Sequence, residues 1–291
     1  MSLFFSIGFS SYAQEYLPEL SPRTQITQDV GYNTISLDYS RPSSRGREVF
    51  GGLVPYNFIW RTGANDDTKI SFKENVVINS TKIEAGEYVI FTIPNKTSWE
   101  FILYQKDENE SNGVPDITKK NQYVWDESKV TLRAIAPAIQ VTEYTETFSI
   151  SLVNVEYDGV TLLFNWANTA VKFDIKTDSD SKVKSFIKDV EDNDPSFYNY
   201  YQIAAFYLAI SQDQKALEKG LEYANRSLEL WEDYGAKYRI LLIKSKYLSK
   251  LNRTKEAIQA AEDALMLAKK ENDSEYIERL SILLNTWKST E

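Results

Sequence analysis

The stretch that decides the fold is "VKFDIKTDSDSKVKSFIKDVEDN", residues 171–193, because the spacing of its apolar residues changes within it. Before Thr177, apolar residues recur at every second position, which is typical of a strand with one buried face. After Asp178 they recur at helical spacing, behind Asp and Ser residues that suit the start of a helix. The sequence therefore predicts a β-rich domain over residues 21–176 and a helical domain over residues 178–291.

Upstream of residue 171, the same alternation extends back to Thr24. It is clearest in "TISLDY" (34–39), "TFSISL" (147–152) and "VTLLFNW" (160–166). Asp158-Gly159 is a tight-hairpin signal between two such runs, and a second hairpin is expected to turn near residues 95–98. A series of about ten short strands with brief connections predicts an antiparallel β-sandwich or an open barrel. The predicted fold class is therefore α+β with two domains.

The helical half contains an internal repeat. "KGLEYANRSLEL" (219–230) aligns with "EAIQAAEDALML" (256–267), and small residues match at the positions where two helices would approach closely. This pattern predicts tetratricopeptide-like helix hairpins, a type whose repeat is about 34 residues, with breaks near Ser211, Asp233 and Asn252. Such arrays usually dock a protein partner on one face. The alternative is a helical cap that only stabilises the β-rich domain.

The composition excludes several kinds of chemistry. The chain of 291 residues has a net charge of -9, no histidine and no cysteine. A general nucleic-acid binder needs a basic surface, while imidazole bases, thiol nucleophiles, disulfides and histidine-bound zinc are excluded outright. The acidic runs at 107–116 and 178–180 lack the EF-hand pattern, and there is no phosphate-binding loop. We expect no cofactor, no metal and no nucleic-acid partner.

The N-terminal stretch "LFFSIGFSSYAQ", residues 3–14, has an apolar run followed by small residues at Ser11 and Ala13. That order is typical of the end of a secretory signal segment, so residues 1–14 predict export to the periplasm, the cell surface or the medium. The alternative is a buried apolar strand at the N-terminus. No other stretch is apolar over about 18 residues, so we expect no transmembrane segment.

Several motifs occur in order along the first half of the chain. They are Ser21-Pro22, "YSRP" (39–42), "GREVFGGLVPY" (46–56), "WRTGAN" (60–65), "AGEYVIFTIP" (85–94) and Trp99. Over residues 21–176 they resemble an uncharacterised family of bacterial secreted proteins known as domain of unknown function 2911. The resemblance implies export and the same domain boundary, and some members similarly carry a helical tail. It implies no catalytic residue, because no activity is established for that family.

Residues 39–66, here called the arginine-rich segment, are the candidate ligand site. Glycines in the segment permit positive-φ turns and exposed amides, and guanidinium groups bind planar anions. An anionic or sugar ligand is therefore one hypothesis. Its candidate residues are Tyr39, Arg41, Arg47, Tyr56, Trp60, Arg61, Asn65 and Asp66. The alternative is structural: Arg61 pairs with Asp66, Asp67 or Glu48 and fixes the segment across the end of the sandwich.

These features favour an exported binding or assembly protein of the bacterial envelope, whose helical domain docks a protein partner. A second hypothesis is a hydrolase of glycan or peptide that uses two carboxylates, with Arg61 orienting the substrate. Acidic residues are abundant, so spacing does not single out its catalytic pair. A third is a helical adaptor with a scaffolding β-rich domain and a groove lined by exposed aromatic residues rather than by charge.

Overall fold

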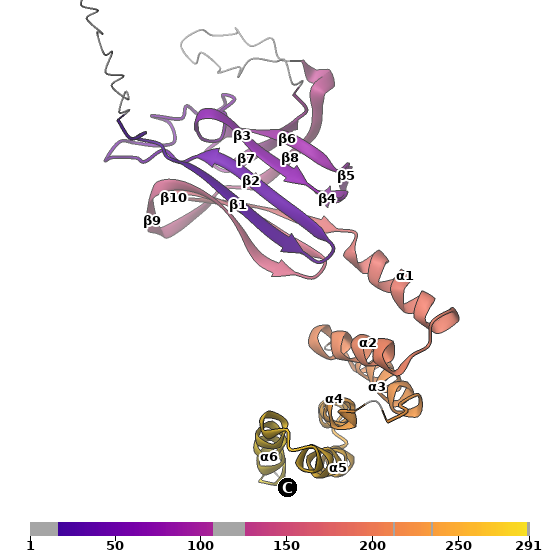
Figure 1. Cartoon of the computed structure of the whole chain (residues 1–291). Coiled ribbons are helices and arrows are strands. Elements are labelled where there is room, and N and C mark those ends of the chain that lie inside the picture. Colours follow the sequence, from indigo (N-terminus) through magenta and orange to yellow (C-terminus); the bar gives the residue numbers. More distant parts are fainter. Residues whose placement is uncertain (1–16, 107–125, 212, 234, 290–291) are drawn as a thin grey trace, which may run out of the picture. The chain divides into compact units, whose positions relative to one another are not determined.

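The computed structural model describes residues 17–106, 126–211, 213–233 and 235–289 (Figure 1). The signal-like segment 1–14 and the acidic run 107–116 lie outside the described residues. The chain divides into two compact units, residues 1–182 and 183–291.

The first unit contains ten strands in its described parts, arranged in two antiparallel sheets. They are β1 (Arg23–Val30), β2 (Asn33–Ser40), β3 (Ala64–Phe72), β4 (Val76–Ile78), β5 (Thr81–Ile83), β6 (Gly86–Pro94), β7 (Ser98–Tyr104), β8 (Val130–Pro137), β9 (Ile139–Glu156) and β10 (Gly159–Thr177). The larger sheet has the order β1-β2-β3-β6-β7-β8, and the smaller has the order β5-β4-β10-β9. The predicted α+β class with an antiparallel β-rich first half is confirmed.

One hydrophobic core takes side chains from both sheets. In β2, Ile35, Leu37 and Tyr39 are at most 2% exposed, as the alternation of this run predicts. From the smaller sheet, Phe164 lies with its ring centroid 6.0 Å from that of Phe101 in β7. The two sheets are therefore the two faces of one sandwich.

The strand β10 explains an irregularity in the sequence pattern. Its buried apolar residues are at even positions first and at odd positions later: Val160, Leu162, Phe164 and Trp166, then Val171, Phe173 and Ile175. The pairing with β9 shifts register on both sides of Ala167, whose φ of 51° is left-handed. A bulge adds one unpaired residue, and a shift of one residue exchanges the two faces of a strand. Two apolar runs of the sequence therefore form one continuous strand.

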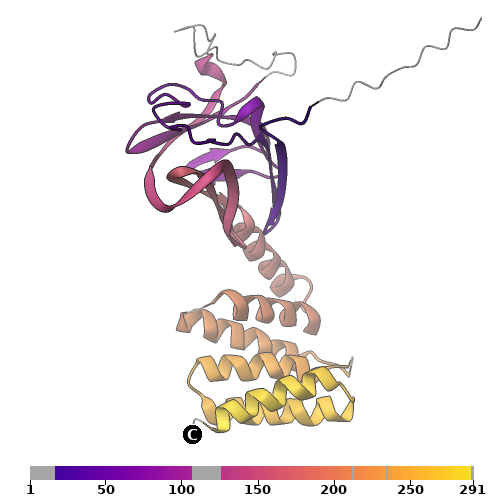
Figure 2. The ribbon, with the colours of Figure 1, turned by 90° about the vertical axis from the view of Figure 1, so that its left-hand side faces the viewer.

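Besides a short 3-10 helix (Glu127–Lys129), the remaining elements are six α-helices in the described residues (Figure 2). They are α1 (Ser179–Asp192), α2 (Phe197–Ile210), α3 (Gln214–Glu229), α4 (Lys237–Lys250), α5 (Thr254–Lys270) and α6 (Ser274–Lys288). The predicted breaks near Ser211, Asp233 and Asn252 are found. A further break was not predicted: α5 ends before Asn272, which has a left-handed φ of 56°, and Asp273 caps α6. No helix in the described parts is long and apolar enough to cross a membrane.

The small residues of the internal repeat lie where helices meet. Those of α3 (Gly220, Ala224, Ser227) and those of α5 (Ala257, Ala261, Ala264) are all buried. At Gly220 the approach is closest, because an added Cβ would lie 2.1 Å from the hydroxyl oxygen of Tyr247 in α4. The close packing of helices that the internal repeat predicts is therefore present.

Candidate functional site

The arginine-rich segment joins β2 to β3 and is attached to both sheets. Ser43 forms a β-bridge with Thr147 of β9 in the smaller sheet. Trp60 pairs with Thr92 of β6 in the larger sheet, through Trp60 N to Thr92 O at 2.7 Å and Thr92 N to Trp60 O at 3.0 Å. The segment therefore crosses from one sheet to the other.

Glu146 of β9 anchors the first half of the segment. Its carboxylate accepts hydrogen bonds from the hydroxyl of Ser44, a fully buried residue, and from the amide of Arg45 at 2.7 Å. The hydroxyl of Ser44 and the amide of Arg45, aided by the charges of Arg45 and Arg47, hold the pKa of Glu146 below its usual range. No local signal in the sequence marks this residue, because it lies 102 positions from Ser44.

A pH dependence follows from the lowered pKa of Glu146. An unfolded glutamate titrates near pH 4.3. The stabilisation by Glu146 is therefore fully present above about that pH, and it is lost as the pH falls through the lower pKa of the folded state. We expect the free energy of unfolding to fall more steeply with acidification in the wild type than in Glu146→Gln. Urea unfolding followed by tryptophan fluorescence from about pH 5 to pH 3 measures this, and equal slopes would contradict it.

The three arginines of the candidate set all donate to main-chain carbonyl groups. Arg41 Nε donates to Phe148 O at 3.0 Å, Arg47 Nε donates to Ser44 O at 2.8 Å, and Arg61 Nη1 donates to Asn65 O. Each guanidinium has five N–H donors, so each arginine keeps donors that these bonds do not use. In this structure Arg47 and Arg61 hold turns of the segment, and Arg41 attaches its beginning to β9.

Two of the three carboxylates expected to pair with Arg61 have other partners, and the third, Glu48, does not pair with Arg61 either in the part of the chain that the structure describes. Asp66 lies 3.5 Å from Arg23 of β1, and the buried Asp67 pairs with Lys106. Within the described parts of the chain, Arg61 makes no ion pair. The segment is therefore fixed by backbone pairing, by arginine–carbonyl bonds and by Glu146, rather than by an ion pair of Arg61.

The aromatic candidates pack inward. Tyr39 is 2% exposed, and its hydroxyl donates to Ile150 O at 3.0 Å and accepts from Ile150 N at 2.8 Å. Trp60 is half-buried in a cluster with four other rings, and Tyr56 packs against Gly51. The candidate Asn65 donates from its side-chain amide to Glu19 and to Ser21 O. The inward face of Tyr39 could be read from the alternation of "TISLDY".

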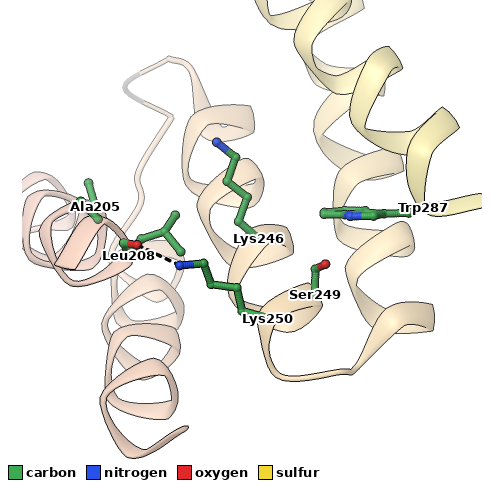
Figure 3. Close-up of a pocket in the computed structure, with 7 residues that line it drawn as sticks. Ala205, Leu208, Lys246, Ser249, Lys250 and Trp287 are labelled. Atoms are coloured by element: carbon green, nitrogen blue, oxygen red, sulfur yellow. Dashed lines mark hydrogen bonds between the residues drawn. The ribbon is translucent and has the colours of Figure 1, made fainter. Parts of the chain in front are cut away.

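A groove is present in the second unit. Helices α2, α4 and α6 line it, and its volume is about 480 Å³. The lining residues are Ala205, Leu208, Ala209, Lys246, Ser249, Lys250 and Trp287 (Figure 3). Lys250 Nζ donates to Leu208 O at 3.4 Å. The helical-adaptor hypothesis predicts a groove lined by exposed aromatic residues rather than by charge. This lining instead combines one indole with two ammonium groups and contains no carboxylate.

In the described parts of the chain, no group of three or more potential ligand side chains is placed to hold a metal ion.

Comparison with family models matches residues 21–175 to the family described as "Protein of unknown function (DUF2911)". The match covers more than half of the chain. Neither the curated proteins nor the solved structures contain a match.

Proposed function

Since the chain belongs to the DUF2911 family of unknown function, we propose that it is a binding protein whose helical unit docks a segment of another protein. The groove on α2, α4 and α6 is the observation that carries this proposal. On the signal-like residues 1–14, we further propose that the protein acts after export, in the periplasm or at the cell surface.

The groove supports a binding role through its shape and lining. Its volume of about 480 Å³ lies within the range of roughly 300–1,000 Å³ that is usual for binding clefts. Ala205, Leu208 and Trp287 supply apolar surface, and two lysines supply polar groups beside it. Stacked helix pairs present faces of this kind to extended chains.

The β-rich unit gives weaker support for a ligand site, because the arginines of its arginine-rich segment are bonded to main-chain carbonyls. An anionic or sugar ligand there would use the remaining donors. A carboxylate-dependent hydrolase gains no support from Asp66 and Asp67, since each pairs with a basic residue. We therefore assign the β-rich unit a supporting role.

The proposal predicts that filling the groove abolishes peptide binding. The full chain is titrated into fluorescein-labelled ten-residue peptides of three classes, acidic, neutral and basic, and anisotropy is measured. Ala205→Trp places an indole in the groove, whereas Lys215→Trp places one on the exposed side of α3 as a matched control. We expect at least one class to bind wild type and Lys215→Trp, and to lose about tenfold or more with Ala205→Trp. Binding that is unchanged in Ala205→Trp, or none in any class, would refute the proposal.

A further inference from the structure

We propose that the groove on α2, α4 and α6 receives an acidic peptide of about five residues, bound in extended form along α4. This inference rests on the proposed function and adds the chemistry of the partner. Charge, spacing and the apolar lining each support it.

The charge of α4 is unlike that of the chain as a whole. The helix carries five basic residues, Lys237, Arg239, Lys244, Lys246 and Lys250, and no acidic residue. The chain has a net charge of -9. A locally positive face on a negative protein attracts a negative partner to that face and repels it elsewhere.

Two of these charges lie in the groove. Lys246 and Lys250 are one helical turn apart, and both project from α4 on the side of α2 (Figure 3). Lys246 makes no ion pair or hydrogen bond within the described residues, and Lys250 has only its 3.4 Å contact with Leu208 O. An ammonium group has three donors. Both lysines therefore keep donors for the carboxylates of a partner.

The length of the peptide follows from the spacing along α4. Arg239 lies outside the groove lining, but it precedes Lys246 by two turns and so extends the basic row along the same face of α4. Its guanidinium lies 5.1 Å from the ring centroid of Tyr276 in α6, and it also approaches Asp273 at 3.9 Å. From Arg239 to Lys250 the helix rises about 16 Å. An extended chain covers that distance in about five residues.

The apolar lining explains why a peptide is favoured over another polyanion. Successive side chains of an extended peptide point to opposite sides. Carboxylates on one side would reach Lys246 and Lys250, while an apolar side chain on the other would contact Trp287. A nucleic acid would instead need many phosphate contacts, and two groove lysines supply few.

The test uses a fluorescein-labelled pentapeptide of alternating glutamate and leucine, and the same peptide with glutamine in place of glutamate. The full chain is titrated into each. Lys246→Gln and Lys250→Gln are compared with Lys244→Gln, whose charge acts on Glu256 of α5 instead. We expect the acidic peptide to bind about tenfold more tightly than the glutamine peptide. Each groove variant should weaken it several-fold, Lys244→Gln should leave it unchanged, and added salt should weaken it.

The outcomes separate this inference from the proposed function. Equal binding of both pentapeptides, or no effect of Lys246→Gln and Lys250→Gln, overturns acid recognition. Docking in the groove still stands in that case if Ala205→Trp abolishes binding. Failure of both pentapeptides overturns the inference, and the ten-residue panel then decides the proposed function. A single-stranded oligonucleotide that binds more tightly with the same lysine dependence overturns the assignment of a peptide partner.

Discussion

Gly220→Ala is expected to lower the free energy of unfolding of the helical unit by about 3 kcal/mol, although alanine is the better helix former by about 1 kcal/mol. The added Cβ would lie 2.1 Å from the hydroxyl oxygen of Tyr247 and 2.3 Å from Cζ. Tyr247 cannot move away easily, because it is fully buried and donates to Ala204 O at 2.6 Å. Overpacking costs about 1–3 kcal/mol, and loss of that buried hydrogen bond adds about 1–3 kcal/mol.

Urea unfolding followed by circular dichroism at 222 nm measures the effect of Gly220→Ala, since the helical unit supplies most of that signal. The double variant Gly220→Ala/Tyr247→Leu removes the ring that causes the clash. Its destabilisation should be smaller than the sum of the two single variants, because the two residues are in contact. A Gly220→Ala protein that is more stable than wild type, as helix propensity alone predicts, would contradict the close approach of α3 and α4.

Much of the fold could be predicted because its signals are local. The alternation in "TISLDY" correctly predicts that Ile35 and Leu37 lie in the core. The internal repeat between residues 219–230 and 256–267 correctly predicts small residues at helix contacts. The bulge at Ala167 could not be predicted. Nothing in an alanine marks it for a left-handed φ, which non-glycine residues rarely adopt. The surrounding strand pairing holds Ala167 in this conformation, and pairing is a property of the whole sheet.

The candidate sites were harder to predict, because they depend on contacts between residues that are far apart in the sequence. Glu146 fixes Ser44 from another strand, and no feature of its own neighbourhood marks it. Lys246 and Lys250 look in sequence like the solvated face of a helix. Only the packing of α2 and α6 beside α4 makes them part of a groove. Conversely, the four arginines of the arginine-rich segment suggested a ligand site because they lie close together in the sequence. In the structure they donate to main-chain carbonyl groups.

Trp60→Ala is expected to destabilise the β-rich unit by about 3 kcal/mol, the lower end of the range for large aromatic residues because Trp60 is half-buried. Its ring centroid lies 4.9 Å from that of Phe148 and 5.8 Å from that of Trp166, both in the smaller sheet. It lies 6.0 Å from that of Trp99 in the larger sheet. The indole therefore joins the two sheets at the point where the arginine-rich segment crosses between them.

Arg61→Ala is the matched variant, because it changes the neighbouring residue of the same segment. Arg61 donates to Asn65 O, and loss of one such bond costs about 1 kcal/mol. Urea unfolding followed by the fluorescence of the remaining tryptophans should therefore rank Trp60→Ala well below Arg61→Ala in stability. The reverse order would mean that the guanidinium, and not the aromatic cluster, holds the segment. If the expected order is found, Arg61→Ala stays folded enough to be titrated with phosphate or a sugar, so the ligand hypothesis for this segment can be tested apart from its structural role.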